Sequence, residues 1–124
     1  MKDYLLFSSV GDNYDDAFMS WICNIDKRNY NIFLIYYGDN KERFNELKKY
    51  GDLVMMRKGS KYQNLTYFYK PLELNTFKYV WVVDDDIKMS SNEISRMFDF
   101  INKKNYCICQ PSMDPSGFNS FNIN

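Results

Sequence analysis

Short apolar runs recur along the chain and alternate with stretches whose apolar residues repeat every three or four positions. Each run is rich in aromatic and β-branched residues and is nearly uninterrupted by polar ones, a pattern typical of strands buried on both faces of a sheet. The pattern predicts five strands: Tyr4–Val10, Asn31–Tyr37, Leu53–Met56, Tyr79–Val83 and Tyr106–Cys109.

Four stretches between these runs predict helices, over residues 14–23, 41–50, 60–70 and 91–104. The last carries Ile94, Met97, Phe98 and Ile101 at helical spacing, and Ser90 with Glu93 forms a capping box at its start. The other helices have less regular stripes, and the inward positions predicted for them are Tyr14, Ala17, Phe18, Trp21 and Ile22 in the first, Phe44 and Leu47 in the second, and Tyr62, Leu65 and Tyr69 in the third.

Glycine and proline are expected to end two of the helices. Gly51 follows the second helix as its C′ residue, and Pro71 stops the third near Lys70 because proline cannot occupy a helix interior. Regular alternation of strand and helix predicts an α/β fold, with a mostly parallel, twisted sheet between two helix layers. Residues 1–110 form this domain, and residues 111–124, which lose all periodicity, are an irregular tail or the start of a further part.

Three aspartates, Asp84, Asp85 and Asp86, directly follow the fourth predicted strand. In an extended segment Asp84 and Asp86 point the same way, where two carboxylates about 6 Å apart would repel by roughly 2–3 kcal/mol at an effective dielectric near 20. A cation between them would remove this cost, and hard oxygen ligands select Mg²⁺ or Mn²⁺. The alternative is a solvated turn or a helix cap, although Ser90 already supplies the cap.

Composition excludes several classes of function. The 16 basic and 16 acidic residues cancel, so no field for nucleic acid or a membrane surface is implied. No apolar stretch is long enough to span a membrane, and the short run at Tyr4 lacks the features of a signal peptide, so a cytoplasmic location is expected. The three cysteines, Cys23, Cys107 and Cys109, fit no disulfide framework, and we expect the last two in the core.

A βαβ unit that ends in a hydrophobic strand and Asp-x-Asp resembles the nucleotide-binding half of GT-A glycosyltransferases. The stretch KGSKYQNLTYFYKPLELNTFKYVWVVDDDIKMS, together with ICQPSMDP further on, also resembles a less characterised GT-A-like group. The likeness covers residues 3–115 and centres on Asp-x-Asp after a buried strand. It implies transfer of a sugar from a UDP- or GDP-sugar to an acceptor hydroxyl on a glycan or protein. It also implies that Asp86 binds Mn²⁺ or Mg²⁺, that Asp84 holds the metal shell or the ribose, and that Asp85 faces the sugar or lies in a solvated turn.

The same resemblance nominates residues at the ends of the other strands. Asp39 would accept a hydrogen bond from the base, and Tyr37 would stack on it; a Gly-Asp turn and rim packing are the respective alternatives. The backbone at Ser9 and Gly11 would border the nucleotide, since glycine permits close approach. Lys61, in the first turn of the third helix, would reach the diphosphate, unless it is simply a solvated lysine.

The resemblance ends where GT-A domains usually continue, so the chain is expected to be truncated at its C-terminus. No histidine is present, and no catalytic residue is assigned. A non-catalytic nucleotide-binding or assembly module is the alternative function. A Mg²⁺-dependent phosphotransfer domain fits less well, because its acidic residues belong at other strands.

Overall fold

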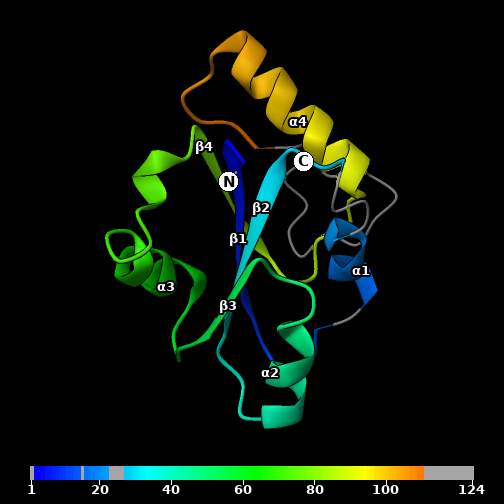
Figure 1. Cartoon of the computed structure of the whole chain (residues 1–124), viewed down its shortest axis with the longest axis vertical. Helices are drawn as coiled ribbons and strands as arrows, with labels where there is room; N and C mark the ends of the chain where they lie inside the picture. Colours follow the sequence, from blue (N-terminus) through cyan, green and yellow to red (C-terminus); the bar gives the residue numbers. More distant parts are fainter. Residues whose placement is uncertain (1, 15, 23–26, 111–124) are drawn as a thin grey trace, which may run out of the picture.

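The computed structural model of the chain describes residues 2–14, 16–22 and 27–110. In these residues four parallel strands form one sheet in the order β3-β2-β1-β4 (Figure 1). This confirms the predicted α/β fold with a parallel sheet. The strands are β1 (Tyr4–Val10), β2 (Tyr30–Tyr36), β3 (Leu53–Met56) and β4 (Tyr79–Asp84), each within one residue of its predicted position.

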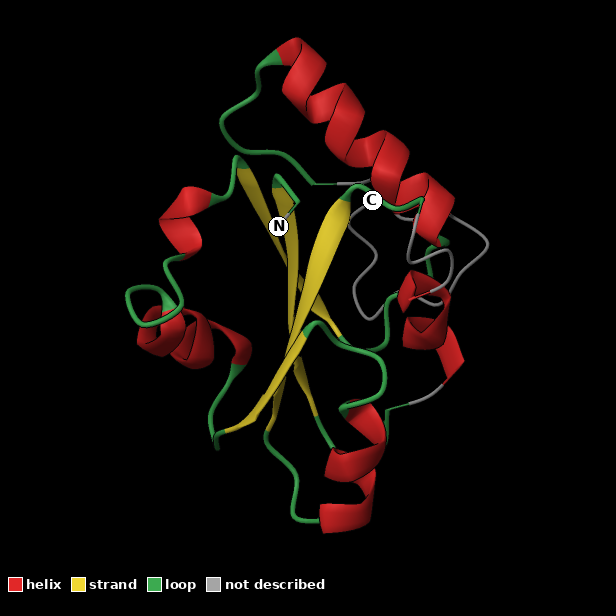
Figure 2. Ribbon diagram, in the orientation of Figure 1, coloured by secondary structure: helices red, strands yellow, loops and turns green. Residues whose placement is uncertain are grey.

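Helices cover both faces of the sheet, so the molecule has three layers (Figure 2). Alternate residues of β1 show the division: Leu6 and Val10 belong to one hydrophobic cluster, whereas Leu5 and Phe7 belong to the other. The first face packs against α1 (Asp16–Met19), the 3-10 helix η1 (Ser20–Ile22), α2 (Lys41–Leu47) and α4 (Ser91–Lys104). The second packs against α3 (Lys61–Phe68) and the 3-10 helix η2 (Leu74–Thr76).

Helix α4 has the predicted bounds. The Ser90 hydroxyl accepts a hydrogen bond from the Glu93 N–H at 3.2 Å, which satisfies one of the free donors at the helix start. Its periodic apolar residues face the sheet, and the Phe98 ring stacks on Tyr4 with centroids 4.9 Å apart. The helix ends at Asn105, whose left-handed conformation (φ 57°) caps it.

The predicted fifth strand is wrong. Residues 106–109 are exposed and pair with no strand among the described residues; Ile108 is 94% exposed, and Cys107 and Cys109 are exposed rather than in the core. The Tyr79 hydroxyl donates to the Tyr106 carbonyl, which ties the segment to the start of β4. An apolar run of four residues specifies no pairing partner, so composition alone misled the prediction.

The inward face predicted for α3 is wrong at two of its three positions, since only Leu65 packs against the sheet. Tyr62 and Tyr69 are 63% and 49% exposed, whereas Phe68 and the polar Asn64 are buried. Asn64 is buried because its amide is fully hydrogen-bonded, as described below.

The first two helices are shorter than predicted. The α-helix after β1 covers only Asp16–Met19 before turning into η1, and α2 ends at a C-cap Lys48, so Gly51 is not its C′ residue. Cys23 and the predicted tail at 111–124 lie outside the described residues. Within the described ranges, no helix is both long and apolar enough to cross a membrane.

Candidate functional site

The carboxyl ends of all four strands lie along one edge of the sheet, because the strands are parallel (Figure 1). This edge, which we call the rim, carries residues 11–13 after β1, 37–40 after β2, 57–60 after β3 and 84–86 at the end of β4. Ligands of open parallel sheets bind at this edge. The rim is therefore where a functional site is expected.

Asp84, Asp85 and Asp86 form a turn, which we call the acidic turn. β4 ends at Asp84, the chain bends at Asp85 and Asp86, and the Ile87 N–H points back to the Asp84 carbonyl at 3.4 Å. The three residues are thus not all extended, and the predicted simple alternation of their side chains does not apply. The segment after the turn is fixed by η1, since the Trp21 indole N–H donates to the Ile87 carbonyl at 2.9 Å.

Asp85 points toward the tip of β1. The Gly11 N–H donates to its Oδ2 at 3.1 Å, a contact that joins residues 74 positions apart in the sequence. Burial raises the pKa of the Asp85 carboxyl, and repulsion from Asp86 and Asp84 adds to this effect, whereas the Gly11 hydrogen bond opposes it. The acidic turn is therefore a place of concentrated negative charge that is partly withdrawn from water.

Asp84 lies next to the start of α3. The Lys61 Nζ is 3.0 Å from its Oδ1, so the two residues form an ion pair. Lys61 is the first residue of α3, and a complete capping box between Ser60 and Gln63 fixes the helix start. The lysine and the carboxylate that the sequence nominated thus lie in contact, although they are 23 positions apart.

Asn64 anchors α3 to β1. Its buried side-chain Nδ2 donates to the Ser9 Oγ at 3.0 Å, and its Oδ1 accepts from Arg57 at 2.9 Å. The Ser9 hydroxyl is therefore hydrogen-bonded in the interior of the protein. Arg57 is likewise engaged by Asn64, and its guanidinium also lies over the Tyr67 ring.

Tyr37 covers the tip of β1. A side chain at Gly11 would place its Cβ only 2.7 Å from the Tyr37 Oη, so glycine is needed for the ring to lie there. Burial raises the pKa of the Tyr37 hydroxyl, and Asp85 and Asp84 raise it further. The Tyr37 ring, beside the acidic turn, therefore already occupies the space that the missing side chain of Gly11 leaves.

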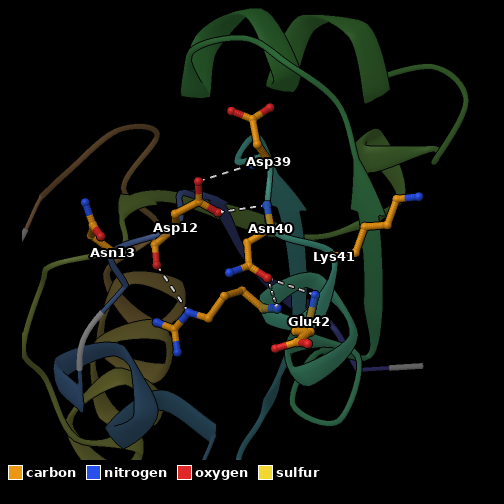
Figure 3. A pocket seen from close by; sticks show the side chains of 7 residues that line it. Asp12, Asn13, Asp39, Asn40, Lys41 and Glu42 are labelled. Carbon is orange, nitrogen blue, oxygen red and sulfur yellow. Dashed lines mark hydrogen bonds between the residues drawn. The ribbon is translucent and has the colours of Figure 1, made fainter.

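An open depression of about 770 Å³ lies at the other part of the rim, over the ends of β1 and β2 (Figure 3). It is lined entirely by polar and charged residues: Asp12, Asn13, Asp39, Asn40, Lys41, Glu42 and Arg43. Asp39 lies here, with its carboxylate pointing away from Asp12 and its Oδ1 2.5 Å from the Lys58 Nζ. None of the three aspartates of the acidic turn lines this depression.

Asp12 organises the depression. Its carboxylate accepts hydrogen bonds from the Tyr36 hydroxyl and from the N–H groups of Asp39 and Asn40, both at 3.2 Å. The hydrogen bond from Tyr36 and those from the two backbone groups lower the pKa of the Asp12 carboxyl. One carboxylate therefore holds the turn after β2 against the tip of β1.

The rim brings some nominated residues together and separates others. Asp84 meets Lys61, and Asp85 meets Gly11, which in turn lies under Tyr37. The Ser9 side chain is buried under α3, and Asp39, which pairs with Lys58, lines the separate depression.

Two organising residues were not nominated. The position of Asp12 after a predicted strand was an available signal for it, whereas Asn64 sits in a helix with no motif that marks it.

The acidic turn fits a divalent cation only as a partial site. Among residues 2–14, 16–22 and 27–110, no three His, Cys, Asp or Glu side chains are grouped as a complete metal site would require. Mg²⁺ commonly takes one or two protein carboxylates and completes its shell with water and substrate phosphates. Asp84 and Asp86 are carboxylates of the kind that such a site uses, and both belong to the acidic turn.

A comparison with protein families adds a finding of its own. The family model described as "Protein of unknown function (DUF707)" matches residues 1–124, the whole chain. No curated protein matches the chain.

Proposed function

Since the chain belongs to the DUF707 family, whose description leaves the activity open, we propose from the geometry of the rim that it is a glycosyltransferase of the GT-A type. It transfers a sugar from a UDP- or GDP-sugar to an acceptor hydroxyl and depends on Mn²⁺ or Mg²⁺. In this reaction the bond between the sugar C1 and the phosphate oxygen breaks, and the nucleoside diphosphate leaves with the bonding electrons. A bond from C1 to the acceptor oxygen forms, and the acceptor hydroxyl releases its proton to solvent.

One observation carries the proposal: a strand-end carboxylate and a lysine at a helix start meet on the rim. Lys61 and Asp84 lie 3.0 Å apart, and Asp85 is bound by the tip of β1. A nucleoside diphosphate needs positive charge around its phosphates and carboxylates that hold a cation. The acidic turn and the start of α3 offer both within one small region.

Five of the nominated residues have a role in this scheme. Asp84 and Asp86 hold the cation, and Lys61 binds the diphosphate. Tyr37 flanks the nucleoside, and Asp39 accepts a hydrogen bond from the base in the depression beyond it. When bound, the divalent cation supplies charge that offsets the negative charge on the departing nucleoside diphosphate.

Binding calorimetry with UDP and GDP, each with and without Mn²⁺, tests the proposal. We expect binding of one nucleotide that requires Mn²⁺ and weakens at least tenfold in Asp86→Asn, because a cation ligand is lost. Asp3→Asn is the matched control: Asp3 is exposed and pairs with Lys78 at the opposite edge of the sheet, so its loss should leave binding unchanged.

Turnover of a bound donor separates an enzyme from the alternative. If UDP- or GDP-sugars bind with Mn²⁺ but are neither transferred nor hydrolysed, the chain is a nucleotide-binding module without catalysis. If neither nucleotide binds under any condition, the proposal is wrong.

A further inference from the structure

The ion pair between Lys61 and Asp84 has a consequence beyond charge balance. We infer that Lys61 is an internal counter-ion whose exchange couples the binding of a divalent cation to the binding of a nucleoside diphosphate. This inference rests on the proposed function, because it concerns the order in which that same site is filled.

The ion pair is built into the fold. Lys61 Nζ lies 3.0 Å from Asp84 Oδ1, and the lysine side chain is only 26% exposed. The backbone of Lys61 is fixed by the Ser60–Gln63 capping box, and Asn64 ties the same helix turn to β1. Asp84 in turn is the last residue of β4, paired with Ser9 in the sheet register. Both partners therefore start from rigid positions.

Without a nucleotide, a cation would have to displace this ammonium group from Asp84. The neighbouring Asp85 offers no easy replacement, since its Oδ2 accepts from the Gly11 N–H. Within the described part of the chain, no third acidic side chain, histidine or cysteine completes a protein-only site. We therefore expect the cation alone to bind weakly.

A diphosphate changes this balance because it gives the lysine a second anionic partner. Lysine has a flexible four-carbon stem, so its ammonium group can move to the phosphate while the helix stays in place. Asp84 is then free for the cation, which also binds the phosphate. By thermodynamic linkage the effect is reciprocal: the cation raises the affinity for the diphosphate by the same factor.

Binding of Mn²⁺ alone, followed by the electron paramagnetic resonance signal of free Mn²⁺, tests the inference. In Lys61→Met the nucleotide-free protein should bind Mn²⁺ roughly two- to fivefold more tightly, the range expected for removing a competing ion pair whose carboxylate is open to solvent. Adding UDP, or GDP if that is the nucleotide that binds, should then increase Mn²⁺ affinity by a smaller factor than in the unaltered protein.

Two variants control for general charge effects. Lys58→Met removes the same charge from the rim, but Lys58 pairs with Asp39 at 2.5 Å, so Mn²⁺ affinity should not change. Lys61→Arg keeps an ion pair with Asp84, so the nucleotide-free protein should not gain affinity for Mn²⁺. Thermal unfolding of each variant verifies that the fold is intact.

The outcomes separate this inference from the proposed function. If Mn²⁺ and a nucleotide bind together but Lys61→Met leaves the affinity for Mn²⁺ alone unchanged, or Lys58→Met tightens it equally, the coupling is wrong and the function stands. If the unaltered protein binds no nucleotide with or without Mn²⁺, the proposed function fails and the coupling fails with it.

Discussion

Two carboxylates on the rim, Asp12 and Asp85, have opposite environments. Asp12 accepts three hydrogen bonds, from Tyr36 and two backbone N–H groups, and its pKa is lowered. Asp85 is half-buried between two other aspartates, and its pKa is raised. The first carboxylate is stabilised as an anion by the fold, whereas the second is held where its charge is costly. Such a cost is typical of residues kept for function rather than for stability.

The lowered pKa of Asp12 predicts how its contribution to stability depends on pH. A carboxyl whose pKa is lower in the folded state stabilises the fold above its unfolded value of 3.8, and this contribution is lost as the pH falls through the folded pKa. Asp12→Asn should therefore lower the free energy of unfolding at pH 7, and the difference from the unaltered protein should shrink below about pH 4.

Urea unfolding between pH 7 and pH 3 measures this difference. Asp39→Asn is the matched control, because Asp39 is exposed and pairs only with the exposed Lys58, so it should cost little at any pH. A deficit for Asp12→Asn that is the same at pH 3 as at pH 7 would contradict the role given to its charge.

At the scale of elements, α3 positions the part of the rim that carries Lys61. Its start is closed by the Ser60–Gln63 capping box, and Asn64 attaches its first turn to β1. Phe68 packs on the second face of the sheet with Leu5 and Phe7. These contacts place the Lys61 ammonium group beside Asp84, although η2 lies between α3 and β4 in the sequence.

Removing the Asn64 amide should loosen α3. Asn64→Ala leaves the Ser9 hydroxyl and the Arg57 guanidinium without their partner and should cost about 1–3 kcal/mol in the free energy of unfolding. Thr66→Ala, on the exposed side of the same helix, should change it by less than about 0.5 kcal/mol. Chemical denaturation compares the two, and equal costs would show that Asn64 is not the anchor.

The elements that the sequence predicted well are those with one dominant signal. β1, β2 and β4 are long apolar runs, and α4 combines helical spacing with a clear N-cap at Ser90. α3 misled the prediction because Tyr62 and Tyr69 suggested a buried face, whereas the buried residues are Phe68 and the polar Asn64, which Ser9 and Arg57 satisfy. Such a residue is buried only because partners far away in the sequence satisfy it, which a local pattern cannot reveal.

The candidate site was predictable in its parts but not in its contacts. The acidic turn, Lys61 and Gly11 all follow from strand ends and helix starts in the sequence. The turn at Asp85, the ring of Tyr37 over Gly11 and the clamp made by Asp12 depend on how three strand ends meet, which spacing along the chain does not specify.

At the scale of the whole molecule, an all-parallel sheet brings the ends of its four described strands to one rim. The order β3-β2-β1-β4 places the acidic turn beside the tip of β1 and puts the Asp12 depression on the other side, over β2. In the proposed function the acidic turn and Lys61 would take the diphosphate, the Asp12 depression would take the nucleoside, and Tyr37 would lie between them. The proposed donor would thus lie across the tips of neighbouring strands.

The position of a bound Mn²⁺ tests this account most directly. Crystals grown with Mn²⁺ and UDP or GDP, with diffraction recorded at the manganese absorption edge, should show one anomalous peak next to the carboxylates of Asp84 and Asp86. The diphosphate should bridge that peak and Lys61. A nucleotide bound away from the rim, or a manganese peak that contacts neither aspartate, would contradict the account.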